Sequence, residues 1–101
     1  KDFQNAFEQC DIIAGATTAT AAFPFGSKSD NPLEMYACDQ FTVAANLASH
    51  PALSIPCGKT AAGLPIGLHL QARSYDEETL LGAAFYYEQH RGFEMGFPSI
   101  L

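Results

Sequence analysis

The three histidines of this chain are the first residues to weigh for metal binding or proton transfer. His50, His69 and His90 are widely spaced, and none has the i, i+4 partner or neighbouring acid typical of a metal site. His50 precedes a proline, His69 alternates within an apolar run, and His90 stands near the end of a helical pattern, where a cation is favoured. We therefore expect structural roles for all three histidines and no metal site.

The three cysteines, Cys10, Cys38 and Cys57, lie 28 and 19 residues apart and form no C-x-x-C pair. Their odd number and their spacing indicate reduced thiols in a cytoplasmic protein and exclude a small disulfide scaffold. Cys57, in a Pro-Cys-Gly turn, is the one that could be a nucleophile, since a thiolate needs a nearby base or a helix N-terminus. The pattern favours a buried structural cysteine instead.

A serine–lysine nucleophile pair is conceivable at Ser27-Lys28-Ser29. No glycine-rich turn surrounds that triplet, so a surface loop is the better interpretation. The chain has no Walker loop and no G-x-G-x-x-G motif. Eleven acidic residues against five dispersed basic ones give a net charge of −6, which argues against direct binding of a phosphate backbone by this chain.

Asp39 differs from the other acids because it stands among apolar neighbours, Tyr36, Cys38 and Phe41, where a helix is expected to begin. One interpretation is a helix N-cap, a position that aspartate favours. The other is a buried carboxylate that binds a ligand ammonium group through a charge-assisted hydrogen bond. The pattern alone favours the cap and leaves both open.

The composition indicates one small globular unit. The chain has 101 residues, 48% of them apolar and 12% aromatic, which suits a modest hydrophobic core. No apolar run approaches the about 18 residues that a membrane span needs. Because residue 1 is a lysine, we expect a processed, truncated or excised chain.

Helical patterns are expected at both ends and in the middle. Phe3 and Phe7 form a short apolar stripe near the start. Asn31-Pro32 predicts a helix start, and the apolar residues that follow predict one helix or two, broken near Asp39, before Pro51 ends the element. Residues 74–77 (SYDE) offer a capping-box pattern for the last helix, which Gly92 should end.

Three strands are expected, at 12–14, 52–57 and 64–72, with a long loop over 15–31 and a turn over 58–63. Two of these strands are apolar on both faces, as in the interior of a sheet. The fold class is therefore α/β, and three strands are few for a self-contained domain of that class. The chain should belong to a larger sheet, and alone it should self-associate through exposed apolar surface and open strand edges.

Residues 31–58, NPLEMYACDQFTVAANLASHPALSIPCG, resemble the C-terminal region of the amidase-signature family. The likeness continues through GLPIGLHLQA at 63–72 and DEETLLGAAFYYEQ at 76–89, and it includes DFQNAFEQCDIIAG at 2–15. The pattern P-L-x-M-Y-x-x-D narrows it to one branch of the family, the A subunits of the glutamyl-tRNA(Gln)/aspartyl-tRNA(Asn) amidotransferases.

The resemblance implies a C-terminal part, over 1–101, of an α/β/α sandwich with a mixed sheet. The A subunits hydrolyse glutamine with a Ser–Ser–Lys triad that lies outside this segment. The ammonia passes to a partner subunit, which uses ATP and Mg²⁺ to amidate mischarged tRNA. Asp39 matches the aspartate that receives the α-amino group of glutamine. By this resemblance the segment alone is inactive, needs no cofactor of its own, and meets tRNA only through the assembled enzyme.

The chain departs from the family pattern at several positions. Ala16 and Ala19 replace expected prolines, Ser49-His50 replaces a pair that usually contains glycine, and His69 stands where glutamine is commoner. Two alternatives stay open: a fragment of another amidase-signature amide hydrolase, and a non-catalytic, stand-alone remnant.

Overall fold

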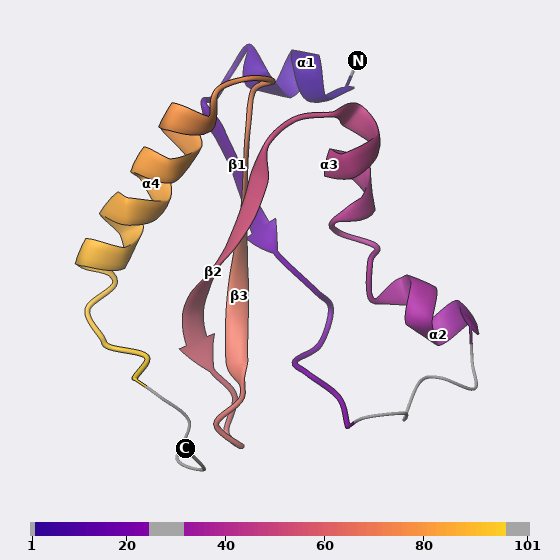
Figure 1. Cartoon of the computed structure of the whole chain (residues 1–101), viewed down its shortest axis with the longest axis vertical. Helices are drawn as coiled ribbons and strands as arrows, with labels where there is room; N and C mark the ends of the chain where they lie inside the picture. Colours follow the sequence, from indigo (N-terminus) through magenta and orange to yellow (C-terminus); the bar gives the residue numbers. More distant parts are fainter. Residues whose placement is uncertain (1, 25–31, 97–101) are drawn as a thin grey trace.

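The computed structural model describes residues 2–24 and 32–96 of the chain, and Figure 1 shows the course of these residues. The elements run in the order helix, strand, two helices, two strands, helix, as the sequence predicts. They are α1 (Asp2–Phe7), β1 (Ile12–Ala16), α2 (Pro32–Ala37), α3 (Val43–Ala48), β2 (Ala52–Lys59), β3 (Pro65–Ala72) and α4 (Glu77–His90).

The three strands form one sheet in the order β1-β3-β2, with both neighbouring pairs antiparallel. The α/β class is confirmed, and so are the three strands, of which the first two run two residues further than predicted. Every pairing among the described residues is antiparallel, so the mixed sheet stays an expectation for the larger domain.

One face of the sheet is covered by α4, and this contact is the hydrophobic core. Inward-facing residues of the strands meet one side of the helix, as strand alternation and helix periodicity require. The buried members are Ile55, Leu70, Ala72, Leu80 and Ala84. In Figure 1, α4 lies on one side of the sheet, α2 and α3 lie on the other side, and α1 crosses one end.

The start of α4 differs from the predicted capping box. Tyr75 has a left-handed backbone (φ 67°), which separates Ser74 from the helix. The cap is Asp76, whose side chain accepts a hydrogen bond from the Thr79 amide at 3.4 Å. Ser74 donates its hydroxyl to the Ser49 carbonyl instead. At the other end, Gly92 follows the helix with φ 84°, so the predicted glycine stop is confirmed.

The expected turn after Cys57 lies later in the chain. Strand β2 continues to Lys59, and a bulge between Pro56 and Gly58 leaves Cys57 as the extra residue. The turn is closed by Thr60, whose amide donates to the Leu64 carbonyl at 2.8 Å. Pro56 is compatible with this strand because β3 is the one strand that pairs with β2 in the described part of the chain.

Helices α2 and α3 confirm that the middle helical pattern is broken around Asp39. Pro32 is the first residue of α2, as predicted. The predicted cap Asn31 and the triplet Ser27-Lys28-Ser29 lie outside the described residues.

Candidate functional site

Asp39 lies in the turn that joins α2 to α3, and its backbone shapes that turn. Its amide donates to the Tyr36 carbonyl at 3.1 Å, which continues the last turn of α2. Its carbonyl accepts from the amides of Thr42 and Val43, each at 3.0 Å, and from the Thr42 hydroxyl at 3.3 Å. The main chain at Asp39 is therefore held from both sides.

The N-cap interpretation of Asp39 is wrong. The residue at the N-cap of α3 is Thr42, whose own side chain makes no capping hydrogen bond. The Asp39 side chain is exposed among the described residues, whereas the ligand interpretation assumed a buried carboxylate, and no hydrogen bond or ion pair joins its carboxylate to another described residue.

A cavity of about 470 Å³ opens beside this turn. One wall comes from residues 18–23, which follow β1, and the other from Ala37, Cys38 and Gln40. Asp39 itself does not line this largely apolar space, although its sequence neighbours Cys38 and Gln40 do. An exposed carboxylate can pair with an ammonium group through a charge-assisted hydrogen bond.

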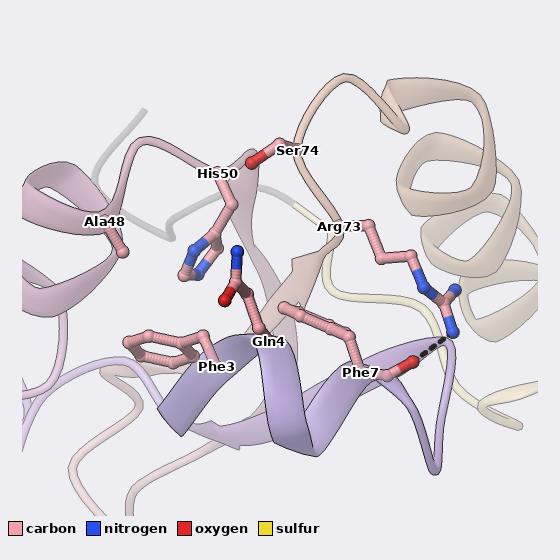
Figure 2. Close-up of a pocket in the computed structure, with 7 residues that line it drawn as sticks. All are labelled: Phe3, Gln4, Phe7, Ala48, His50, Arg73 and Ser74. Atoms are coloured by element: carbon pink, nitrogen blue, oxygen red, sulfur yellow. Dashed lines mark hydrogen bonds between the residues drawn. The ribbon is translucent and has the colours of Figure 1, made fainter. Parts of the chain in front are cut away.

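A second cavity, of about 440 Å³, lies where α1 meets the end of the sheet (Figure 2). His50 forms one wall and packs edge-on against Phe3 and Phe7, with ring centroids 4.5 and 5.7 Å apart. A 2.7 Å hydrogen bond joins His50 Nε2 to Gln71 Oε1. Because an amide oxygen only accepts, Nε2 carries the proton. His50 follows α3, so this hydrogen bond connects the end of that helix to β3, which agrees with the expected structural role of the histidine.

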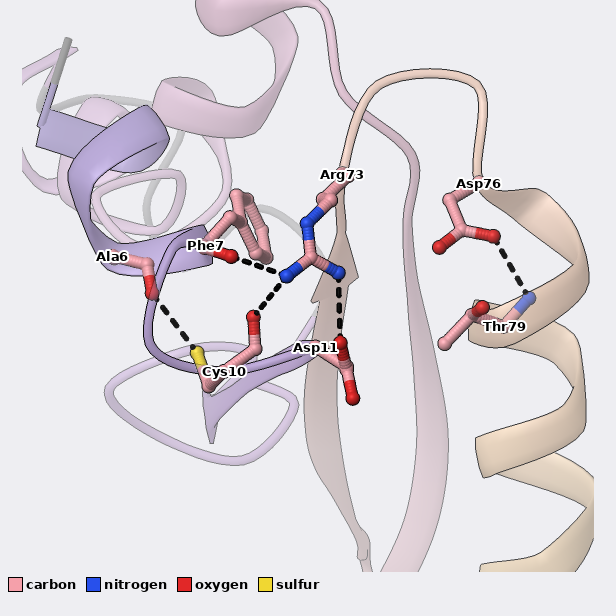
Figure 3. Close-up of polar contacts among 7 residues, drawn as sticks. All are labelled: Ala6, Phe7, Cys10, Asp11, Arg73, Asp76 and Thr79. Carbon is pink, nitrogen blue, oxygen red and sulfur yellow. Dashed lines mark hydrogen bonds and ion pairs between the residues drawn. The ribbon is translucent and has the colours of Figure 1, made fainter.

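Arg73, which follows β3, borders the same cavity and anchors the end of α1 (Figure 3). Its guanidinium donates to the carboxylate of Asp11 at 2.8 Å, to the Cys10 carbonyl at 3.0 Å and to the Phe7 carbonyl. Sequence reasoning missed this role, because the bonded residues are more than 60 positions apart in the chain. No local pattern could have indicated it.

The remaining candidates that the structure describes, the cysteines and His90, are not brought together into a catalytic arrangement. Cys57 is half-buried in its bulge and lines none of the cavities described here, and Cys10 and Cys38, like Cys57, form no disulfide. His90 Nδ1 is bonded to the Tyr86 carbonyl on α4 at 2.8 Å. Among the described residues, no group of three or more histidine, cysteine or acidic side chains could hold a metal ion. Within the same residues, no helix is long and apolar enough to cross a membrane.

Comparison with known proteins agrees with the motifs. A family model described as Amidase matches residues 1–81. The chain belongs to the amidase family. The match covers the strands, the Asp39 turn and the start of α4, so the resemblance drawn from the motifs is confirmed.

Within the amidase family the chain is similar to one kind of subunit. It is 50% identical over 100 residues to the A subunit of the glutamyl-tRNA(Gln) amidotransferase of Roseiflexus sp. (strain RS-1), covering 99% of this chain and 20% of that protein. It is 49% identical over 94 residues to the protein of the same name from Parvibaculum lavamentivorans, covering 93% of this chain and 19% of that protein.

A solved structure supports the same relationship. The crystal structure of the glutamyl-tRNA(Gln) amidotransferase A subunit from Thermotoga maritima matches with a TM-score of 0.86 at 30% sequence identity. The match covers 96% of this chain and 22% of that one. The chain thus spans about a fifth of the length of the relatives it matches.

Proposed function

We propose that this chain is the C-terminal segment of a glutamine-hydrolysing amidotransferase A subunit. In the complete enzyme, this subunit releases ammonia for the amidation of misacylated Glu-tRNA(Gln) or Asp-tRNA(Asn). The segment contributes three strands to the sheet of the complete polypeptide and part of the wall of the glutamine pocket. The Ser–Ser–Lys triad lies elsewhere in the same polypeptide. A partner subunit uses ATP and Mg²⁺, and the assembled enzyme is cytoplasmic.

The observation that carries this proposal is the Asp39 turn. The turn holds the main chain through three hydrogen bonds to the Asp39 carbonyl, yet leaves the carboxylate without a partner among the described residues. The residues on either side of it, Cys38 and Gln40, line the 470 Å³ cavity. An exposed carboxylate in this turn can receive the α-ammonium of glutamine through a charge-assisted hydrogen bond.

The test replaces Asp39 by asparagine in the full-length polypeptide, which is then assembled with its partner subunits. A lost charge pair in a partly dry site costs roughly 2–5 kcal/mol. At about 1.4 kcal/mol per decade, glutamine-dependent amidation should therefore fall by one to three orders of magnitude. Amidation from free ammonia should stay nearly unchanged, because it bypasses the glutamine pocket.

Asp76→Asn is the matched control, since asparagine caps a helix about as well as aspartate and Asp76 caps α4. It should leave both activities unchanged. Full glutamine-dependent activity in the Asp39 variant would reject the ligand role. An equal loss with glutamine and with ammonia would show a folding defect instead.

Two other functions predict different results, one in activity assays and the other in the intact mass of the source protein. A small-amide hydrolase of this family would release ammonia from simple amides without amidating tRNA. A stand-alone remnant would have an intact mass near 10.9 kDa in its source, where the full-length amidotransferase polypeptide would be about five times larger. Residues 1–101 alone, without the triad, should release no ammonia from glutamine or asparagine.

A further inference from the structure

A third cavity lies between α3 and the face of the sheet that α4 leaves uncovered, and its volume is about 270 Å³. Four parts of the chain contribute to it: the end of β1, helix α3 with its flanking residues, β2 and β3. We call it the His69 pocket. Its polar wall residues are Thr17, Thr42, Asn46, His50, Ser54 and His69.

His69 is the unusual member of this wall. It sits in the central strand, opposite Gly15 on one side and Ser54 on the other, and it is only 5% exposed. No hydrogen bond joins its imidazole to another described residue. No fully buried side-chain nitrogen or oxygen in the described part of the chain lacks a partner, so the unpaired ring nitrogens must be reached from the pocket.

The neighbouring side chains keep spare hydrogen-bonding capacity. Asn46 donates one amide hydrogen to the Thr42 carbonyl at 3.2 Å, which leaves its amide oxygen available as an acceptor. The hydroxyls of Thr17 and Ser54 lie 2.6 Å apart, so one donates to the other and a second hydroxyl hydrogen is left over. The pocket therefore offers donors and acceptors together.

The wall carries no acidic, lysine or arginine side chain. Burial lowers the pKa of the His69 imidazole below its usual 6.5, and the neighbouring His50 lowers this pKa further. At neutral pH the imidazole is uncharged, with one donor and one acceptor nitrogen. A charged guest would find no counter-ion here, and an apolar guest would leave His69 unpaired, which is costly for a buried polar group.

We propose that the His69 pocket binds an uncharged carboxamide group. Such a group places an acceptor oxygen beside N–H donors without net charge, which matches the unsatisfied groups of the wall. The volume is slightly below that of typical drug-sized sites, about 300 Å³ or more, so a small guest fits. Two sources can supply the group: a free small amide or, in the arm that rests on the proposed function, a peptide or side-chain amide from the rest of the A-subunit polypeptide.

The test follows the imidazole resonances by NMR while acetamide is added, both to the 101-residue chain and to the complete polypeptide that carries it. Saturable, millimolar-range shifts should appear at His69 and His50 but not at His90, which lies on α4 with its ring bonded to Tyr86. Acetate, with the same shape but a charge, should give no saturable shift at His69. A free amide ligand predicts this result in both proteins.

An amide from the rest of the polypeptide predicts a different pair of results. The 101-residue chain should still respond to acetamide, while the complete polypeptide should not, because its own amide fills the pocket. In the complete polypeptide, the His69 ring N–H should then exchange slowly with solvent. If the 101-residue chain proves unfolded, the shift and the exchange rate in the complete polypeptide decide between binding and no binding.

Two substitutions distinguish hydrogen-bonded recognition of the amide from simple filling of the pocket. His69→Gln keeps a donor and an acceptor and should keep the acetamide response, read at His50, within about tenfold, or 1.4 kcal/mol. His69→Leu removes both and should abolish the response. The proposal is overturned by equal responses to acetamide and acetate, or by an unchanged response in His69→Leu. It is also overturned if the folded 101-residue chain gives no response, or if the complete polypeptide combines no response with fast exchange at His69.

Discussion

At the scale of single residues, Ser49 holds a conformation that its side chain disfavours. It ends α3 with a left-handed backbone (φ 61°, ψ 42°), and its amide donates to the Ala45 carbonyl. This conformation costs an ordinary residue about 1–2 kcal/mol, and glycine adopts it freely. A helix end with glycine here would be more stable.

Ser49→Gly should therefore raise the free energy of unfolding by about 0.5–1 kcal/mol, after the greater freedom of glycine in the unfolded chain is subtracted. Urea denaturation of the folded protein measures this value. Ser49→Ala is the matched control, because alanine also lacks the hydroxyl but keeps the backbone cost. If the glycine variant is no more stable than the alanine variant, the left-handed backbone is not the cause.

Residue-scale prediction from the sequence succeeded where the signal is local. The break around Asp39 was predicted from apolar periodicity and confirmed, since helix spacing is visible within a few turns. The capping role of Asp39 was wrong because Thr42, three residues later, is also a favoured cap type. The environment of His69 could not be predicted, since it depends on which strands flank it.

At the scale of elements, hydrogen bonds from Arg73 fix the position of α1 relative to the sheet. Its ion pair with Asp11 is exposed, with the two side chains 42% and 78% accessible, and such pairs contribute little. The bonds from the guanidinium to the carbonyls of Phe7 and Cys10 close the end of α1. Arginine can serve three acceptors because its donors form a rigid fork.

Arg73→Lys should lower the free energy of unfolding by about 1–2 kcal/mol, because an ammonium cannot reproduce this fork. Hydrogen exchange should rise mainly at the amides of α1. Asp11→Asn removes only the exposed ion pair and should change stability by less than about 1 kcal/mol. Equal losses in the two variants would show that the ion pair, and not the carbonyl contacts, holds α1.

Strands and helices were predicted better than their ends. The apolar runs of β2 and β3 were clear because their residue types are ones that suit a pleated, half-buried surface. The bulge at Cys57 and the cap at Asp76 were missed. Both depend on pairing register or on backbone angles, which a single sequence does not display.

At the scale of the whole molecule, the chain forms a thin layer. Its extents are 41, 36 and 18 Å, and its radius of gyration of 15.3 Å exceeds the about 13 Å expected of a compact chain of this length. Large apolar side chains remain exposed on both sides, among them Leu47 at 81% and Phe85 at 64%. Among the described residues, strands β1 and β2 each have a single neighbour, so each presents an open edge.

The 101-residue chain on its own should therefore self-associate at micromolar concentration. Exposed apolar area and open strand edges both drive such association. The chain covers only about a fifth of its relatives' length. Sedimentation velocity measures the association.

The double variant L81E/F85E adds charge to side chains that are already exposed and should leave the fold intact. It should weaken association if the outer face of α4 carries it, and leave association unchanged if the strand edges do. A well-folded monomer at that concentration would contradict the prediction and favour a self-sufficient domain.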